Sequence, residues 1–204
     1  LLGSVLLLLG IEKLKIINDS KSTNGESTAA ALSSFSNIFW ILVPILGLFI
    51  LIGYIVDVVN SIVSGQKEQG LPVFRGFGET LSEGFMYFIR AIPLIFAVMA
   101  VAGISAMIND SLGAIVYLLL TFFYIPIATI NLMVKKKVSA IFEFKNIFGM
   151  VFQNFVGYIS TLIKTMGFFL VTGVLSLVFV GIPMQLLATN VYIADFYREN
   201  SGNK

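Results

Sequence analysis

Long uncharged stretches alternate with short charged ones along this chain, and their lengths predict where its helices lie. Residues 27–56 carry no charge, and a helix needs only about 20 apolar residues to cross a bilayer. Between Asn146 and Asp195 the one charged residue is Lys164, so that stretch has room for two crossings. Spanning helices are predicted in this way at 37–63, 85–108, 111–134, 155–178 and 182–199. The polar "NDS" at 109–111 predicts a tight hairpin between the second and the third.

The first residues form an apolar segment that is too short for a complete span. The segment 1–17 reaches Glu12 after a run of apolar residues, and the first residue is not Met. We expect it to be the end of a helix whose beginning is missing, and the apolar core of a cleaved signal peptide is the alternative. Residues 18–36 are rich in Ser, Thr and Asn without periodicity, which predicts a solvated external loop.

Two further stretches repeat their apolar residues at helical spacing. In 72–84 the residues Phe74, Phe77 and Leu81 recur at steps of three and four, while charged residues lie on another face. The stretch 138–152, which follows three consecutive lysines, has a comparable apolar stripe. Both are predicted to be amphipathic helices that lie in the membrane interface, and ordinary loops with chance spacing are the alternative.

The composition places the whole chain in a lipid environment. Hydrophobic residues make up 57% of the 204 residues and charged residues 12%, against roughly a quarter in a soluble domain. We therefore predict an all-α fold with one membrane domain over 1–204. This domain is a polytopic helix bundle of about six spanning helices, the first one truncated, plus the two interfacial helices. The net charge of +2 is too small to indicate a nucleic-acid partner.

The positions of lysine and arginine predict the orientation in the membrane. Cytoplasmic loops of membrane proteins carry an excess of these residues near the helix ends. In this chain they gather in the middle loops and at the C-terminus, and fewer lie in the N-terminal region. The expected localisation is therefore the cell membrane, with several spans and a cytoplasmic C-terminus.

Before the last predicted span, three charged residues lie inside the spans: Asp57, Arg90 and Lys164. Asp57 and Arg90 are expected a few residues inside their helices on the same side of the membrane, with Lys164 somewhat deeper. Such charges are costly alone and tolerable when they pair inside a bundle. We predict that Asp57 bonds to Arg90 or to Lys164. Separate snorkelling of each side chain to the head groups is the alternative.

Catalytic and metal-binding patterns are sparse in this sequence. The absence of Cys and His removes the usual thiolate nucleophile, the usual general base and the commonest metal ligands. Ser160 and Lys164 lie one helical turn apart, as a nucleophile and its activating amine can, but helix packing and snorkelling explain them better. We therefore expect no enzyme activity, no cofactor and no metal site.

Several short motifs resemble those of a known family. They are the pair Gly53 and Tyr54 near a helix end, a polar link into Leu71 and Pro72, an approach through Gly84 to "IRAIP", and "NFVGYI" before the last helices. From about Ile38 onward the chain resembles the domain-of-unknown-function family 4013, multi-pass membrane proteins found largely in archaea. The resemblance implies a multi-pass fold and a membrane location, and it implies no chemistry.

The expected function follows from packing surfaces rather than from a reactive site. Ala97, Ala100, Gly103 and Ala106 form a stripe of small residues suited to close helix contact. We expect a non-catalytic membrane scaffold or accessory subunit, whose partners are the lipid bilayer and other membrane subunits or a second copy of the chain. A transporter or channel component for small solutes or ions is the alternative, because prolines in the spans offer helix breaks.

Overall fold

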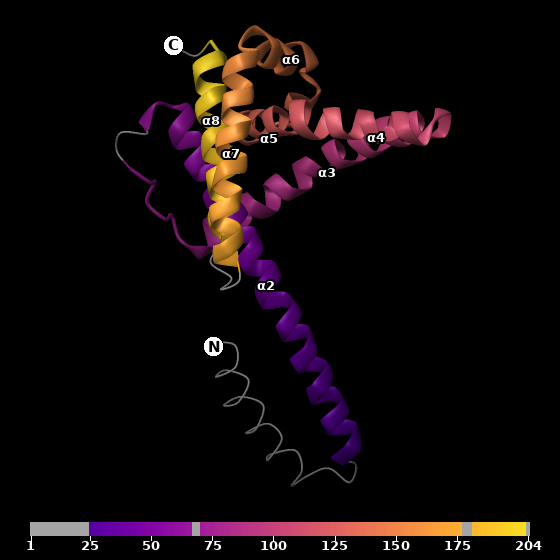
Figure 1. Ribbon diagram of the computed structural model, residues 1–204. Helices are drawn as coiled ribbons and strands as arrows, with labels where there is room; N and C mark the ends of the chain where they lie inside the picture. The colour runs from indigo at the N-terminus through magenta and orange to yellow at the C-terminus, as the bar shows by residue number, and fades with distance from the viewer. Residues whose placement is uncertain (1–24, 67–69, 177–180, 203–204) are drawn as a thin grey trace. The chain divides into compact units, whose positions relative to one another are not determined.

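Helices make up all the regular structure that is described. The computed structural model describes residues 25–66, 70–176 and 181–202, and this part of the chain contains no strand (Figure 1). The predicted all-α fold is therefore confirmed. The helices are α2 (Gly25–Val63), α3 (Phe77–Ile108), α4 (Asp110–Leu119), the π-helical turn η2 (Leu120–Tyr124), α5 (Ile125–Lys135), the 3-10 helix η3 (Val138–Phe142), α6 (Phe144–Gln153), α7 (Phe155–Leu175) and α8 (Gly181–Asn200).

The chain divides into two compact units, and the boundary falls within α2. The first unit is Leu1–Leu48 and the second is Phe49–Lys204. In the first unit α2 is already helical at Gly25, so the later part of the loop predicted at 18–36 is helix instead. Three consecutive alanines at 29–31, which are the best helix formers, account for this difference. The partial helix predicted at 1–17 lies outside the described residues.

Four helices within the described ranges are long and apolar enough to cross a membrane. They are Leu42–Val63, Phe77–Ile108, Asp110–Lys135 and Phe155–Leu175. The helix α8 has 20 residues, but polar side chains such as Gln185 and Asn190 interrupt its apolar character, and it is not among the four. The lengths and hydrophobicity of these helices define a membrane protein.

One continuous helix, α3, replaces two helices that the sequence predicts separately. The predicted interfacial helix 72–84 and the predicted span 85–108 are joined from Phe77 onward, and the residues just before Phe77 are not helical. The start is set by Gly76, whose φ of 112° lies in the region that favours glycine. The amphipathic spacing before residue 85 is therefore that of the first turns of α3 and not that of a separate helix.

The second predicted interfacial helix, 138–152, is divided in two. The helix η3 ends at Phe142, and α6 starts at Phe144 after the non-helical backbone of Glu143. Within the predicted apolar stripe, Ile147 and Val151 are completely buried. A location of α6 in the membrane interface stays a prediction.

The span predicted at 111–134 contains the π-helical turn η2 in its middle. Pro126 lies in the first turn of α5 and has no N–H, so the carbonyl of Phe122 loses the donor that a helix normally places four residues on. The hydroxyl of Tyr158 in α7 donates a hydrogen bond to this carbonyl instead. A neighbouring helix thus satisfies the backbone group freed by proline, as a helix in lipid requires.

The hairpin predicted between α3 and α4 is present at Asn109. Its side-chain oxygen accepts hydrogen bonds from the backbone N–H groups of Ser111 at 2.8 Å and Leu112 at 3.3 Å, which caps the start of α4. Just after this cap, Gly113 packs against Ala106 so closely that an added Cβ would lie 2.5 Å from the alanine Cβ. The two helices therefore meet through small residues near their turn.

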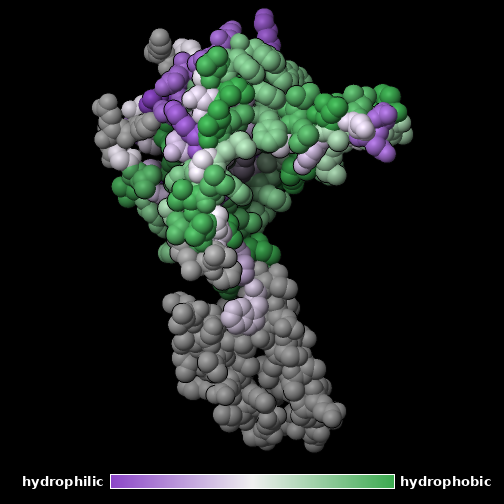
Figure 2. Space-filling model, in the orientation of Figure 1, coloured by the Kyte–Doolittle hydropathy of each residue, from purple (hydrophilic) through white to green (hydrophobic). Residues whose placement is uncertain are grey.

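The buried core of the second unit is centred on α5. This helix buries Ile127, Ile130 and Leu132 almost completely, and Val59 of α2 and Val151 of α6 belong to the same core. Hydrophobic residues cover the outer faces of α3, α4 and α7 in Figure 2, and hydrophilic residues gather near the C-terminal end of α8 and at the tip of the α3–α4 hairpin. Outward apolar faces of this kind suit a lipid environment.

Candidate functional site

Two glycines allow α2 and α3 to cross with their backbones in contact. A Cβ added at Gly53 would lie 1.9 Å from the carbonyl oxygen of Thr80, and one added at Gly84 would lie 1.8 Å from that of Phe49. Any side chain at either position would push the helices apart, so the crossing requires glycine on both. Gly53, the first residue of the Gly-Tyr motif, therefore has a packing role.

The second residue of that motif, Tyr54, holds the segment between α2 and α3. Its hydroxyl donates a hydrogen bond to the carbonyl of Pro72 at 3.3 Å, and its ring lies beside Phe74 with the ring centres 6.4 Å apart. The segment after Gly70 thus turns back along α2. Leu71, the remaining motif residue, is exposed.

This path brings Arg75 to Asp57. The guanidinium Nε donates to Asp57 Oδ2 at 3.0 Å, and Nη2 makes a second bond to Oδ1, so the pair is bidentate. The side chain of Asp57 is 13% exposed and that of Arg75 is 42% exposed, so the carboxylate is mostly buried and the arginine lies at the surface. The predicted partners, Arg90 and Lys164, are therefore wrong. An interfacial helix over 72–84 would have held Arg75 on a solvated face, and this helix does not form.

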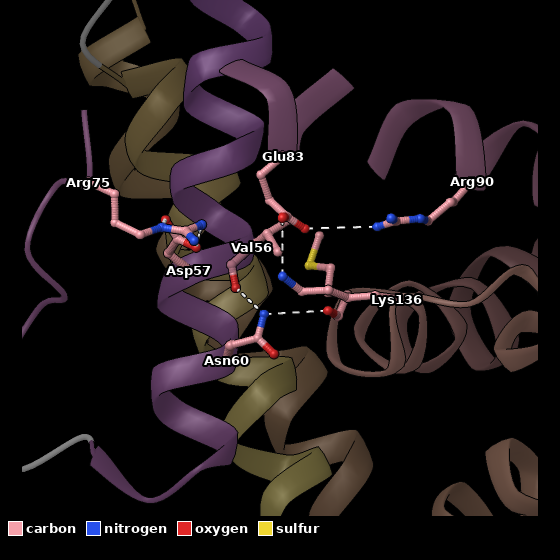
Figure 3. A network of polar contacts seen from close by, with 8 residues as sticks. Val56, Asp57, Asn60, Arg75, Glu83, Arg90 and Lys136 are labelled. Carbon is pink, nitrogen blue, oxygen red and sulfur yellow. Dashed lines mark hydrogen bonds and ion pairs between the residues drawn. The ribbon is translucent and has the colours of Figure 1, made fainter. Parts of the chain in front are cut away.

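A second acidic residue, Glu83, binds two cations. Its Oε2 lies 3.1 Å from Nζ of Lys136, and its Oε1 lies 3.9 Å from Nη1 of Arg90, which is about two turns further along α3. Figure 3 shows Glu83 between the two cations. Lys136 is the left-handed C-cap of α5, with φ of 52°, so the end of this helix is tied to α3.

An amide completes this polar cluster by joining α2 to α5. Asn60 Nδ2 donates to the carbonyl of Val56 at 2.7 Å in its own helix and to that of Met133 at 3.4 Å in α5 (Figure 3). Together with the ion pairs of Asp57 and Glu83, this bond connects α2, α3 and α5. The cluster consists of Asp57, Asn60, Arg75, Glu83, Arg90 and Lys136.

Lys164 stands apart from this cluster. It is exposed on α7, and the ion pairs among the described residues do not include it. Ser160, one turn earlier, is exposed as well. Of the predicted trio, the structure therefore pairs Asp57 and Arg90 with other residues and leaves Lys164 on the surface.

The small-residue stripe of α3 is used only in part within the chain. Ala106 packs against Gly113 of α4, and Ala97 is half-buried. Ala100 and Gly103 are exposed, and a Cβ added at Gly103 would meet nothing within 4 Å.

A second polar network, which sequence reasoning missed, surrounds Asn131 of α5. Its side chain is completely buried. Nδ2 donates to the carbonyl of Ala140 at 2.7 Å and to Glu143 Oε2 at 3.4 Å, while Oδ1 accepts the hydroxyl of Tyr197 from α8 at 2.6 Å. An amide within the apolar run of a span is the sequence feature that could have indicated it.

Glu143 extends this network toward the surface. It forms an ion pair with Lys135 and accepts a hydrogen bond from Asn146 Nδ2 at 2.9 Å. The hydrogen bond from Lys135, followed by that from Asn146, holds the pKa of Glu143 below its ordinary value. The carboxylate is therefore held in its charged form next to the end of α5.

A polar pocket and an apolar groove lie on α6. The pocket has a volume of about 330 Å³ and is lined by Lys135 of α5, by residues of α6 and by the C-terminal end of α8; the α6 residues are Lys145, Asn146, Gly149, Met150 and Gln153. The groove has a volume of about 470 Å³ and is lined by four phenylalanines and three aliphatic residues of α4, η2, α6 and α7. Within the described ranges, no group of three or more Asp, Glu, His or Cys residues could hold a metal ion.

The fold and these clusters define a helical, multi-pass membrane protein in which two clusters of polar side chains join neighbouring helices. Residues 37–181 match the family described as "Protein of unknown function (DUF4013)". Because the match covers more than half of the chain, the protein belongs to this family, and the resemblance in its motifs is confirmed.

A second comparison reaches only part of the chain. Over 71 residues the sequence is 37% identical to UDP-N-acetylmuramoylalanine--D-glutamate ligase of Bartonella henselae. This stretch is 34% of the present chain and 11% of the ligase, so the chain corresponds to a small fraction of that enzyme's length. No solved structure matches the chain.

Proposed function

We propose that this protein is a non-catalytic scaffold or accessory subunit of the cell membrane, which binds a spanning helix of another membrane protein at the face of α7 around Lys164. In this proposal the C-terminus lies in the cytoplasm, an orientation supported by the lysines and arginines of the middle loops. The proposed partner carries a carboxylate at the depth of Lys164.

The observation that carries the proposal is the exposure of Lys164 near the middle of α7. Its helix neighbours Ile163 and Met166 are also exposed, by 62% and 60%. A lysine at the centre of a spanning helix costs about 3 kcal/mol on insertion scales. A carboxylate on a neighbouring helix offsets this cost, whereas snorkelling to the head groups is the explanation that needs no partner.

Other charged residues of the spans support this view by contrast. Asp57 is bonded to Arg75, and Glu83 binds both Lys136 and Arg90. These contacts hold segments of the same chain together, and each acidic residue has a cationic partner within the chain. Lys164 has no such contact within the described residues, so an interaction outside the chain is the natural role for its charge.

The test compares native complexes of the full chain and of three variants. A photo-crosslinking residue in place of Ile163 should capture a membrane protein whose spanning helix contains Asp or Glu. Lys164→Met should abolish this crosslink and reduce the size of the native complex, while Lys164→Arg should retain both. Lys137→Met, at an exposed lysine outside the spans, is the matched control. Persistence of the complex in Lys164→Met would overturn the proposal.

Transport of a small solute is the alternative, and the polar pocket beside α6 is the observation in its favour. Tracer flux into vesicles that contain the purified protein separates the two functions. A scaffold leaves the flux at the level of protein-free vesicles. A flux that depends on the protein and falls in a Lys145→Gln variant would favour transport.

A further inference from the structure

We propose that the polar pocket and the apolar groove of α6 together bind one anionic phospholipid, with its phosphate in the pocket and an apolar chain in the groove. This inference is independent of the partner proposed at Lys164. It rests on the position of the two cavities, on the charge of the pocket and on the apolar surface that surrounds the chain.

The two cavities are neighbours along a single stripe of α6. Phe148 and Gly149 each lie three or four residues from Lys145 and from Phe152, which places the four residues side by side on one face of the helix. Lys145 and Gly149 line the polar pocket, and Phe148 and Phe152 line the apolar groove. A ligand with an anionic end and an apolar end can therefore reach both across this stripe.

The pocket favours an anion because its charges do not cancel. Lys135 is paired with Glu143, but Lys145 takes part in none of the ion pairs among the described residues. Gln153 and Asn146 add side-chain amides to the lining. One positive charge with amide donors around it suits a phosphate group, and such charge-assisted hydrogen bonds are among the stronger ones.

The groove favours an apolar chain by its lining and its place. Phe123, Phe148, Phe152 and Phe155 form most of it, and the rings of Phe148, Phe152 and Phe155 are stacked in sequence with centres 6.1 and 6.4 Å apart. Its other wall comes from α4 and η2, which belong to the candidate span Asp110–Lys135. A lipid chain is the apolar ligand that is present at this place in a membrane.

The combination also predicts which lipid is preferred. A headgroup with a quaternary or primary ammonium would bring a cation toward Lys145 and Lys135, where like charges repel. A phosphatidylglycerol headgroup brings no cation. We therefore expect phosphatidylglycerol to bind more tightly than phosphatidylcholine with the same chains.

The test measures lipid binding to the purified full chain in detergent by native mass spectrometry. Phosphatidylglycerol should bind at least about tenfold more tightly than phosphatidylcholine. Lys145→Gln should weaken the binding of both lipids, because the phosphate that both carry loses a charged hydrogen-bonding partner. It should also remove most of the preference, because the unpaired charge that repels the choline ammonium is gone. Lys137→Gln should leave the preference unchanged, since Lys137 is exposed and does not line the pocket.

A steric variant tests the pocket without removing a charge. A Cβ added at Gly149 would have Gln153 Nε2 as its nearest neighbour, at 4.0 Å, so Gly149→Leu can be accommodated in the folded chain and its larger side chain would occupy the pocket. Leucine also favours the helix more than glycine does. We expect Gly149→Leu to keep the melting temperature of the parent and to lose the preference for phosphatidylglycerol.

Three results would overturn the proposal. Equal binding of the two lipids would remove the anionic site, and equal preference in Lys145→Gln and Lys137→Gln would place it elsewhere. Displacement of phosphatidylglycerol by millimolar inorganic phosphate would identify a site for free phosphate and not for lipid. None of these measurements involves a protein partner, so they stand apart from the test of Lys164.

Discussion

Replacement of Gly53 by alanine should weaken the fold by forcing α2 and α3 apart. The added Cβ would lie 1.9 Å from the backbone carbonyl of Thr80, about 1.5 Å short of the 3.4 Å at which ordinary contact begins. The obstacle is backbone, so a change of side-chain rotamer cannot relieve it. Both helices must shift, and the neighbouring bonds of Tyr54 and Asp57 shift with α2.

The loss of stability in Gly53→Ala can be estimated by comparison with a matched control variant. Overpacking of this kind costs about 1–3 kcal/mol. Alanine has a higher helix propensity than glycine by about 1 kcal/mol, which opposes the loss. Gly103→Ala in α3 has the same gain in propensity without a clash, because its added Cβ meets nothing within 4 Å. The difference between the two variants therefore isolates the cost of the crossing.

Thermal unfolding in one mild detergent, at one scan rate, measures that difference. For a chain of this size, 1–3 kcal/mol corresponds to a melting temperature about 2–12 °C lower for Gly53→Ala than for Gly103→Ala. Gly84→Ala should behave like Gly53→Ala, because its Cβ would lie 1.8 Å from the carbonyl of Phe49. Equal melting temperatures for Gly53→Ala and Gly103→Ala would refute the close crossing.

Three further predictions follow from the charges. Asp57→Arg should lower the melting temperature, and adding Arg75→Asp should recover part of the loss while adding Arg90→Asp should not; recovery by the second would contradict the observed pairing. The pKa of Glu143 is lower in the folded chain than in the unfolded chain, so this residue stabilises the fold above its unfolded pKa, and the stabilisation is lost as the pH falls through its folded pKa. Melting curves between pH 7 and about 3 should show this loss of stability in the parent and not in Glu143→Gln. A cysteine in place of Lys137 should react with a membrane-impermeant thiol reagent only after the cells are permeabilised. Labelling in intact cells would contradict the proposed orientation.

The spanning helices could be predicted because a bilayer sets their minimum length. An apolar run near 20 residues is meaningful only where a bilayer of fixed thickness must be crossed, and the first four complete predicted spans each overlap one of the four candidate membrane-spanning helices of the described residues. Residues before 37 were harder to predict. Neutral residues such as those at 29–31 fit a loop by composition and a helix by propensity, and the structure has the helix.

The partner of Asp57 could not be predicted for a different reason. It depends on the path of a short non-helical segment, and that path is set by the positive φ of Gly70 and Gly76 and by the bond from Tyr54 to Pro72. The apolar spacing of residues 72–84 predicts a helix that includes Arg75. The non-helical segment instead carries Arg75 back to α2, where Asp57 is 18 residues earlier in the chain.

Polar side chains determine which helices pack against α5. In the sequence alone, a polar residue in an apolar run indicates only an energetic cost in lipid. In lipid, apolar contacts alone do not select one helix neighbour over another, because lipid chains are as apolar as leucine. α5 is bonded to α2 through Asn60, to α3 through Lys136 and to α8 through Asn131 and Tyr197. Polar contacts thus select α2, α3 and α8 as the neighbours of α5. Apolar packing alone would not distinguish these helices from one another. The polar pocket lies where α5 and α8 meet α6, so the same contacts that orient α5 also hold its walls in place.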